Sequence, residues 1–480
     1  MKRESKRKRN LIIDFVSQTV FVMFLVVSIA LFGIVISLGI LPTKYLVIGI
    51  IAAILIYGLI GFLIFIKRGR IRKIILSILC IVFMIVYLFL FRYLDSTLDF
   101  MNKIKAGSYQ TEDYYVIALK DSSFNDINDV KNIGVYSNYL SKYNEAIKLL
   151  NEKNSYEVVN YESYNELTTA LFNKEIETII LSSSSKDVLS DIDNEFESKI
   201  KIVYVFEVKT ENNVETTDTD VTEESFNIYI SGIDVFGDIN TISRSDVNMV
   251  VTVNPNTNKI LLTSIPRDYY VQLHGTTGTK DKLTHSGYYG INMTIETIED
   301  LLEIDIDYYV RVNFTTVVSL VDAIGGIEVY SDTAFTAWTD KSCKFPVGNV
   351  KLDGKCALAY SRERYAYKGG DRHRVQNQQD VIKAIIKKAM SSEVLIKKYA
   401  DILESMGDSF QTNMPTEKIY ELINKQLDEM PNWTVETYSL NGSDSSNVTY
   451  TYGDQVLYVM KPNMDTVNEA KKKIKEMMLN

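Results

Sequence analysis

Three long apolar runs near the N-terminus constrain this chain more than any other feature of its sequence. The first extends from Phe15 to Leu41 without a charged residue, and the others extend from Tyr45 to Ile66 and from Ile74 to Phe91. A membrane-spanning helix needs roughly 20 consecutive apolar residues, a length that the third run barely reaches. The sequence therefore predicts three transmembrane helices within residues 1–92, and the first run is too long for a cleaved signal peptide.

The charges that flank these runs predict the orientation of the anchor. KRESKRKR precedes the first run and KRGRIRK, residues 67–73, separates the second from the third, whereas the LPTK loop holds a single lysine. Because basic residues favour the cytoplasmic side, we expect a multi-pass protein of the cell membrane with a cytoplasmic N-terminus. Residues after about 92 are then extracellular. If the third run lies in the membrane interface instead, those residues are cytoplasmic.

Charge is unevenly distributed along the rest of the chain. Of 52 Lys+Arg and 61 Asp+Glu in 480 residues, the first 100 residues hold 13 and 4. Residues 101–480 therefore carry 39 basic and 57 acidic side chains, a net charge of −18. A region this acidic argues against nucleic acid as a partner. Three histidines and no CxxC pair also argue against a zinc site.

The remainder divides into two α/β regions. Residues 102–208 alternate between short apolar runs and amphipathic stretches, which predicts a small domain with a parallel sheet. It shows no ligand-binding constellation, so we interpret it as an accessory domain. The polar, acidic segment at residues 209–225 is typical of a linker. A second domain is expected from residue 226 to residue 480.

A β-hairpin is predicted where ISRSDVNMVVTVNPNTNKILLTSIPRD follows the strand FNIYISGID. If its turn is centred between Asn256 and Thr257, Asp246 on one strand lies opposite Arg267 on the other. Arg244 lies just beyond this pair. The pair is either an ordinary cross-strand ion pair or one edge of a site that holds both a metal and an anion.

Four arginines stand in the segment YSRERYAYKGGDRHRVQNQQ, residues 360–379. Guanidinium groups are planar, permanently charged and suited to bidentate binding of phosphate oxygens. Arg362 and Arg364 are two residues apart, so on an extended segment both side chains point to the same side. The segment is either part of a phosphate-binding site or a solvated basic loop before an ordinary helix.

A helix is predicted to follow, from about Asp371 past Met390. On this helix Arg374 and Gln378 are four residues apart, and the same stripe continues through apolar residues. Those residues are Val381, Ile382, Ile385 and Ala389. Because the stripe enters the core, we expect Arg374 and Gln378 to lie in a pocket rather than in open solvent.

Two cysteines follow the anchor, since Cys80 lies in the third apolar run. Cys343 and Cys356 stand on either side of a turn-like FPVGN. An even cysteine count outside the membrane permits a disulfide, which contributes about 3 kcal/mol for a loop of this size. Two free buried thiols are the alternative.

Several segments together resemble the LytR-CpsA-Psr family, closely in its capsule-type CpsA branch. They are SGID, SRSDVNMVVTVNP, LLTSIPRD, DKLTHSGYYG, VNFTTVVSLVDAIGGIEV, LDGKCALAYSRER and GGDRHRVQNQQ. The first 90 residues also resemble the three-span anchor of that branch. The resemblance implies an α/β catalytic domain, for which we expect a mixed central sheet flanked by helices.

The resemblance also implies an extracellular Mg²⁺-dependent phosphotransferase. Such an enzyme takes a glycopolymer, here capsular polysaccharide, from an undecaprenyl-pyrophosphate carrier. It attaches the polymer through a phosphodiester to the 6-hydroxyl of N-acetylmuramic acid in peptidoglycan. Capsule-assembly proteins are further candidate partners.

Site residues are implied by position in the matching segments. Asp234 and Asp246 match the residues that bind Mg²⁺ with the pyrophosphate, with Mn²⁺ as an alternative. Asp371 is a candidate general base, and an orienting partner for Arg362 or Arg364 is an equally good interpretation. The catalytic candidates besides Asp371 are Arg267, Arg362 and Arg364, and the pyrophosphate-binding candidates are Arg244, Lys282, Arg374 and Gln378.

Two other functions remain compatible with the sequence. A sensor could bind a lipid-linked phosphate in the same arginine pocket without turning it over, and could do so without a metal. A pyrophosphatase could hydrolyse the carrier. A lipid tail would need an apolar slot among the helices of the second domain, but slot and core both consist of leucine, isoleucine and valine.

Overall fold

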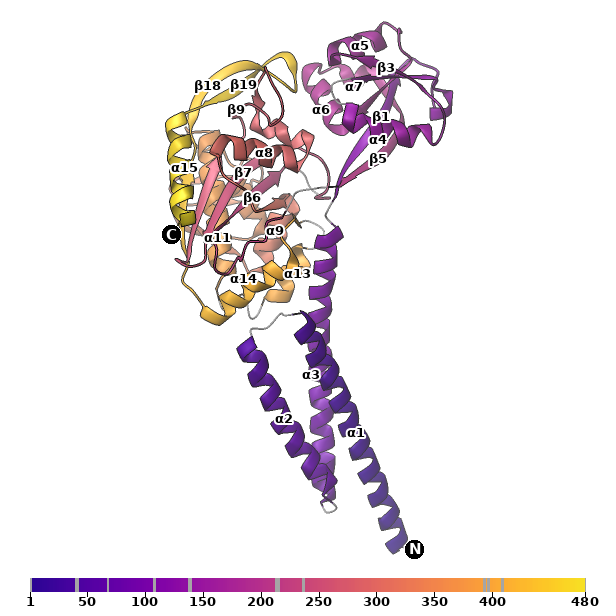
Figure 1. The fold of residues 1–480 in the computed structure, drawn as a ribbon, viewed down its shortest axis with the longest axis vertical. Coiled ribbons are helices and arrows are strands. Elements are labelled where there is room, and N and C mark those ends of the chain that lie inside the picture. The colour runs from indigo at the N-terminus through magenta and orange to yellow at the C-terminus, as the bar shows by residue number, and fades with distance from the viewer. Residues whose placement is uncertain are drawn as a thin grey trace.

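The computed structural model describes most of the chain in ten segments. These are residues 2–38, 43–66, 69–106, 109–136, 140–211, 216–234, 238–391, 394, 398–406 and 410–479. Part of the expected LPTK loop and part of the basic 67–73 loop therefore lie outside the described residues, as do residues 212–215 of the expected linker. Figure 1 shows a bundle of long helices joined to two globular regions.

The bundle consists of α1 (Lys2–Leu38), α2 (Thr43–Phe65) and α3 (Arg70–Ala106). Within the described segments, three helices are long and apolar enough to cross a membrane, which confirms the predicted number. Lys73 on α3 pairs with Asp14 on α1 at 2.7 Å. The N-terminal ends of α1 and α3, which carry the basic residues, point the same way in Figure 1. The orientation in the membrane stays a prediction.

The first globular region contains a sheet in the order β3-β2-β4-β1-β5. Its parallel part is β2, β3 and β4, as expected, but β1 runs antiparallel to both β4 and β5, so the prediction of a parallel sheet was wrong in part. A parallel connection needs a crossover helix, and β1 is followed only by a short 3-10 turn. The elements are β1 (Tyr109–Leu119), β2 (Asn132–Tyr136), α4 (Leu140–Asn151), β3 (Glu157–Tyr161), α5 (Tyr164–Phe172), β4 (Thr178–Ser182), α6 (Ser183–Ile192), α7 (Phe196–Lys199) and β5 (Ile200–Glu211).

The second region is built on a mixed sheet in the order β16-β11-β6-β7-β8-β17, as expected. Its strands are β6 (Phe226–Ile233), β7 (Ser245–Asn254), β8 (Lys259–Ile265), β11 (Tyr308–Val312), β16 (Phe410–Thr412) and β17 (Thr434–Ser439). In the β7–β8 hairpin Asn254 pairs with Lys259, which is the register predicted from a turn centred between Asn256 and Thr257.

Helices cover both faces of this sheet because its central strands are apolar on both sides. On β8, Leu261 faces a core shared with α8 (Ile291–Leu302) and α15 (Met464–Leu479). Its neighbours Ile260 and Leu262 face α11 (Asp371–Ala389) and α14 (Thr416–Glu429). The remaining helices are α9 (Phe314–Ala323), α10 (Gly354–Arg362) and α13 (Tyr399–Met406), and short strands are β9 (Tyr270–Val271), β10 (Asp281–Lys282), β12 (Ile327–Ser331), β13 (Phe335–Thr336), β14 (Lys344–Phe345) and β15 (Gly348–Leu352).

Residues 434–462 form three strands, of which only β17 joins the mixed sheet. β18 (Gly442–Thr449) and β19 (Gly453–Pro462) form a separate hairpin, visible as the long yellow ribbon in Figure 1. The sequence GSDSSNVT of β18 has the composition of a loop, because much of the ribbon lies in solvent and needs no apolar alternation.

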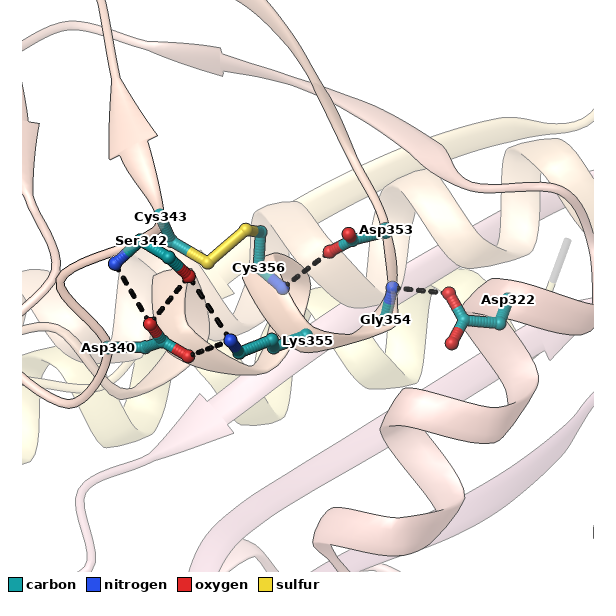
Figure 2. Close-up of a disulfide and its surroundings, with 8 residues drawn as sticks. All are labelled: Asp322, Asp340, Ser342, Cys343, Asp353, Gly354, Lys355 and Cys356. Atoms are coloured by element: carbon teal, nitrogen blue, oxygen red, sulfur yellow. Dashed lines mark hydrogen bonds and ion pairs between the residues drawn. A yellow bond between two sulfur atoms is a disulfide. The ribbon is translucent and has the colours of Figure 1, made fainter.

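The predicted disulfide between Cys343 and Cys356 is present (Figure 2). It joins the loop before β14 to the first turn of α10. Asp353 caps this helix by accepting a hydrogen bond from the Cys356 amide at 2.8 Å. On the other side of the bridge, Lys355 pairs with Asp340 at 2.7 Å. The disulfide therefore fixes a surface loop against the helix that ends at Arg362.

Replacing both bridged cysteines with alanine is expected to destabilise the second region by about 3 kcal/mol, as the entropy of a loop of this length predicts. The measurement is calorimetric unfolding of the full chain in detergent. Cys80→Ala, which removes the free cysteine of the anchor, is the control and should leave this transition unchanged. An unaltered transition in the double variant would contradict the expectation.

Candidate active site

The carboxylates of Asp234 and Asp246 lie at one end of the mixed sheet. Asp234 directly follows β6, and Asp246 is the second residue of β7. The register of the two strands shifts between Gly232 and Ile233, so Asp246 is the extra residue of a β-bulge. A bulge re-aims a side chain that would otherwise follow the strand's alternation. Two acidic groups are thus presented at the same edge of the sheet.

Arg267 is the centre of an ion-pair cluster at this edge. Its Nη1 donates a hydrogen bond to Asp246 Oδ2 at 2.9 Å, which confirms the predicted cross-strand pair. Its Nε lies 3.6 Å from Asp268 Oδ2 and 4.0 Å from Asp371 Oδ1. The Arg267 side chain is only 23% exposed. Removing one member of such a partly desolvated cluster is costly, because it leaves a charge without its partner away from water.

The loop before α8 completes one side of the cluster. Thr284 Oγ1 donates to Asp246 Oδ1 at 2.9 Å, and Lys282 Nζ lies 3.1 Å from Asp268 Oδ1. The loop packs so closely on β7 that a Cβ at Gly287 would lie 2.5 Å from the Ser243 carbonyl oxygen. Only glycine permits this approach, which places both Thr284 and Lys282 within reach of the carboxylates.

The start of α11 supplies the opposite side. Arg374 Nη2 lies 3.0 Å from Asp371 Oδ1, one turn earlier on the same helix. Asp371 therefore lies between Arg374 and Arg267, rather than beside Arg362 or Arg364 as one interpretation of the sequence had it. Two cations flank its carboxylate, as expected for an orienting group, but its Oδ1 accepts no hydrogen bond within the described residues.

Arg362 also lies near Asp234 at this edge of the sheet, but not in the expected geometry. It is the last residue of α10, so the expectation of an extended segment carrying Arg362 and Arg364 on one side was wrong. The Asp353 cap starts a helix that continues through Arg362 and ends before Arg364. The Arg362 guanidinium stacks on the Phe314 ring at 4.1 Å and lies 3.5 Å from Asp234 Oδ1.

The arginines of the cluster have N–H groups that could bind an anion. Burial would raise the pKa of Asp246, but the charges of Arg267 and Arg374 and the Thr284 hydroxyl hold this pKa below its ordinary value. Arg267 Nε and Arg374 Nε are buried and make no hydrogen bond within the described chain. Unsatisfied buried N–H groups are costly, and phosphate oxygens would satisfy them.

An apolar cavity of about 470 Å³ opens beside these groups. It lies between the sheet and helices α9, α11 and α14, where the sequence leaves room for a lipid slot. Asp234, Asp246, Arg362, Arg374 and Gln378 line it together with apolar side chains. The apolar lining includes Ile228, Val251, Val310, Val317, Leu320, Ile382, Ile385 and Trp433. The predicted α11 stripe thus runs from cationic and amide groups into a hydrophobic chamber.

Two predicted residues make their closest polar contacts outside the cluster. Arg364 donates from Nη2 to the Tyr365 hydroxyl at 3.0 Å, and among the described residues it forms no ion pair with the carboxylates named above. Arg244 lies 3.8 Å from Asp191, which belongs to α6 in the first globular region. Tyr452 donates a hydrogen bond to the same Asp191 oxygen at 2.9 Å. The first region therefore places a carboxylate beside a candidate phosphate-binding arginine.

Replacing Asp191 with asparagine should raise the affinity for a pyrophosphate ligand, because Arg244 loses a competing carboxylate. The Arg244 and Asp191 side chains are 46% and 51% exposed. Exposed pairs contribute under about 1 kcal/mol, so the increase should not exceed about fivefold. Isothermal titration of the full chain with a short-chain prenyl pyrophosphate measures it. Asp193→Asn, which removes an acid from the same region, is the control, and equal or weaker binding by Asp191→Asn would contradict the expectation.

Sequence reasoning missed three contributors: Asp191, Asp268 and Thr284. Asp268 follows Arg267 directly and Thr284 stands in the DKLTHSGYYG segment, so proximity to motif residues was an available signal for both. Asp191 offered none, because α6 has the polar sequence SSSKDVLSDI and its contact depends on how two separate regions pack.

Comparison with known proteins identifies the family. The model of the LytR_cpsA_psr family matches residues 196–473, more than half of the chain. A relative from Bacillus mycoides is 36% identical over 215 residues, which cover 45% of this chain and 68% of the relative. It is named polyisoprenyl-teichoic acid–peptidoglycan teichoic acid transferase TagU. A relative of the same name from Enterococcus faecalis is 36% identical over 40% of this chain and 62% of its own length.

Solved structures with similar sequences include a TagT bound to LIIa-WTA and the TagV of B. subtilis. The first is 29% identical and covers 55% of this chain and 95% of its own, with a TM-score of 0.46. The second is 30% identical and covers 53% of this chain and 98% of its own, with a TM-score of 0.45.

Proposed function

The chain belongs to the LytR_cpsA_psr family, and from this premise we propose a membrane-anchored transferase that moves a glycopolymer from a polyprenyl-pyrophosphate carrier onto peptidoglycan. One observation carries the proposal: arginine and aspartate side chains lie together at the mouth of an apolar cavity. A lipid pyrophosphate has the same division, with a charged head on an apolar tail. The curated relatives, whose names state this transfer, support the proposal.

The cavity volume indicates how the carrier is held. An apolar cavity of about 150 Å³ holds one benzene molecule, so a chamber of about 470 Å³ holds roughly 18 carbon atoms, or three to four isoprene units. The rest of a longer prenyl chain stays in the bilayer, which the three-helix anchor keeps close by. This arrangement lets the enzyme bind the head of a lipid without extracting the whole molecule.

The reaction is a phosphoryl transfer at the cluster. An acceptor hydroxyl oxygen forms a bond to the sugar-side phosphorus, the bridging P–O bond breaks, and the polyprenyl phosphate leaves. Arg267 and Arg374, whose Nε groups make no hydrogen bond to the described residues, stabilise the negative charge that develops on the leaving phosphate. The hydroxyl proton passes to a base, and Asp371 is the candidate from the sequence. Its position between Arg267 and Arg374 favours a role in orienting these two arginines.

Asp234 and Asp246 would hold Mg²⁺, or Mn²⁺ in its place. Their donor set fits, because Mg²⁺ needs one or two carboxylates and takes its other ligands from phosphate and water. No cluster of three or more acidic, histidine or cysteine side chains suited to a metal occurs in the described segments, so such an ion would depend on the pyrophosphate. When bound, it would neutralise charge on the phosphates.

The cargo that we propose is capsular polysaccharide, attached to N-acetylmuramic acid. The three-span anchor supports this choice, since the chain resembles the capsule-type branch of the family in that feature. The relatives' names specify teichoic acid instead, so both polymers belong in any assay. On this proposal the catalytic domain lies outside the cell membrane.

The test uses the full chain in nanodiscs with a lipid-pyrophosphate-linked glycan, peptidoglycan, and either Mg²⁺ or EDTA. Glycan joined to peptidoglycan only in the presence of the metal supports the proposal. Tight binding of the lipid without turnover in either condition would identify a sensor. Free glycan phosphate without a joined product would identify a pyrophosphatase.

A further inference from the structure

Two exposed aromatic rings stand together on the second globular region. Trp338 and Tyr365 are 61% and 60% exposed, and their ring centroids lie 4.9 Å apart. Each carries a cation: Lys341 Nζ lies 4.8 Å from the Trp338 ring, and the Arg364 guanidinium lies 5.0 Å from the Tyr365 ring. We call these four side chains the aromatic platform. Large exposed aromatics paired in this way are typical of binding surfaces.

A buried carboxylate holds the aromatic platform in place. Glu363 is only 2% exposed. One of its oxygens accepts the Trp338 amide at 2.6 Å, and the other accepts the amides of Arg364 and Tyr365 at 3.1 and 2.8 Å. A single buried side chain thus joins two separate loops. The Cys343–Cys356 bridge fixes the same loop a few residues further on. The two rings are therefore preorganised rather than loosely attached.

The platform is continuous with the candidate active site. Arg362, which lines the cavity mouth and contacts Asp234, directly precedes Glu363. Arg364 follows Glu363 but turns to Tyr365 instead of the carboxylate cluster. Arg362 and Arg364 therefore belong to the candidate active site and to the platform respectively, so the platform adjoins the cavity mouth along the chain.

We propose that the aromatic platform binds the glycan strand of peptidoglycan, a role that rests on the proposed transferase function. The flat faces of pyranose rings present C–H groups that pack on the negative faces of aromatic rings. Arg364 and Lys341 suit the hydroxyl and amide oxygens of the glycan, since the lactyl carboxyl of N-acetylmuramic acid is amide-linked to the stem peptide in peptidoglycan. The donor is already held at its pyrophosphate by the cluster and at its lipid by the cavity, whereas the acceptor has neither attachment and needs a site of its own.

The two tryptophans of the chain allow a direct test. Trp433 lines the cavity and Trp338 stands on the platform. In a Trp433→Phe chain, fluorescence reports on the platform alone, and in a Trp338→Phe chain it reports on the cavity alone. The probe is a strand of alternating N-acetylglucosamine and N-acetylmuramic acid whose lactyl carboxyls are amidated, added to the full chain in nanodiscs. We expect the strand to change Trp338 emission and to leave Trp433 emission unchanged.

Kinetics provide the second readout. Trp338→Ala and Tyr365→Ala should each raise KM for the acceptor by about tenfold, as loss of one stacking contact implies, while KM for the lipid donor stays the same. Trp338→Phe should restore most of the loss. Tyr330→Ala, which removes an equally exposed tyrosine (63%), is the matched control. An unchanged acceptor KM in both platform variants would overturn the proposal.

Two outcomes separate this proposal from its alternatives. If Trp338 emission does not change when the glycan strand is added but is quenched by brominated lipids in the nanodisc, the platform is a membrane contact and the proposal fails. If the wild-type chain transfers nothing, the proposed transferase function fails, while the Trp338 titration still reports whether glycan binds.

Discussion

The Arg267→Ala variant loses glycopolymer transfer, with kcat lower by about a thousandfold, the upper range for removing one preorganised donor at a developing negative charge. The expected effect is large because Arg267 contacts Asp246, Asp268 and Asp371 at once. Its loss removes a cation from the phosphate and also leaves three carboxylates without their shared partner. Initial rates of glycan transfer to peptidoglycan measure the effect.

Arg267→Lys and Arg372→Ala distinguish the loss of a catalytic guanidinium from a nonspecific effect of removing an arginine. Lysine keeps the charge but not the planar fork, so Arg267→Lys should fall between wild type and alanine. Arg372 stands on the same helix as Arg374, yet it is about half exposed and pairs with Asp444, so Arg372→Ala should retain activity. Comparable losses in Arg372→Ala and Arg267→Ala would contradict the assignment of Arg267.

Filling the cavity should abolish use of the natural lipid while leaving the protein at least as stable. Val317 lines the chamber from α9, and phenylalanine there would occupy the space of about one isoprene unit. Losing the burial of five carbon atoms costs about 4 kcal/mol, or close to a thousandfold in donor affinity. A side chain that fills an existing void commonly stabilises a protein by about 1 kcal/mol, so the melting temperature should hold or rise.

A headgroup-only ligand gives the control for this second prediction. Val317→Phe should bind inorganic pyrophosphate as well as wild type does, since the charged cluster is unaltered. Val456→Phe, at a position that is 63% exposed on β19, should bind the long-chain lipid normally. Unchanged binding of the long-chain lipid by Val317→Phe would show that the chamber is not the lipid site.

Local patterns in the sequence predicted those parts of the site that depend on local geometry. The β7–β8 hairpin fixes its own register, so the pairing of Asp246 with Arg267 followed from the position of the turn. Helical periodicity likewise placed Arg374 and Gln378 on the stripe that enters the cavity. Both inferences use residues that are close along the chain, where backbone geometry determines which side chains meet.

The remaining features depend on contacts between distant segments. Isoleucine and valine line the cavity and fill the core alike, so sequence could not separate the two. The Asp353 cap indicates that a helix begins before Arg362, but the arginine spacing was interpreted as an extended segment. Asp191 reaches Arg244 only through the packing of two globular regions. Such packing leaves no periodic pattern in either segment.

The most direct test of the account is the chemical nature of the product. Wild-type full chain in nanodiscs would be incubated with Mg²⁺, peptidoglycan and a lipid-pyrophosphate-linked glycan, and the washed peptidoglycan would be examined by ³¹P NMR. The account predicts a phosphodiester signal in the wall fraction, released polyprenyl phosphate in equal amount, and neither in Arg267→Ala. A phosphomonoester on soluble glycan, with no phosphorus in the wall fraction, would contradict it.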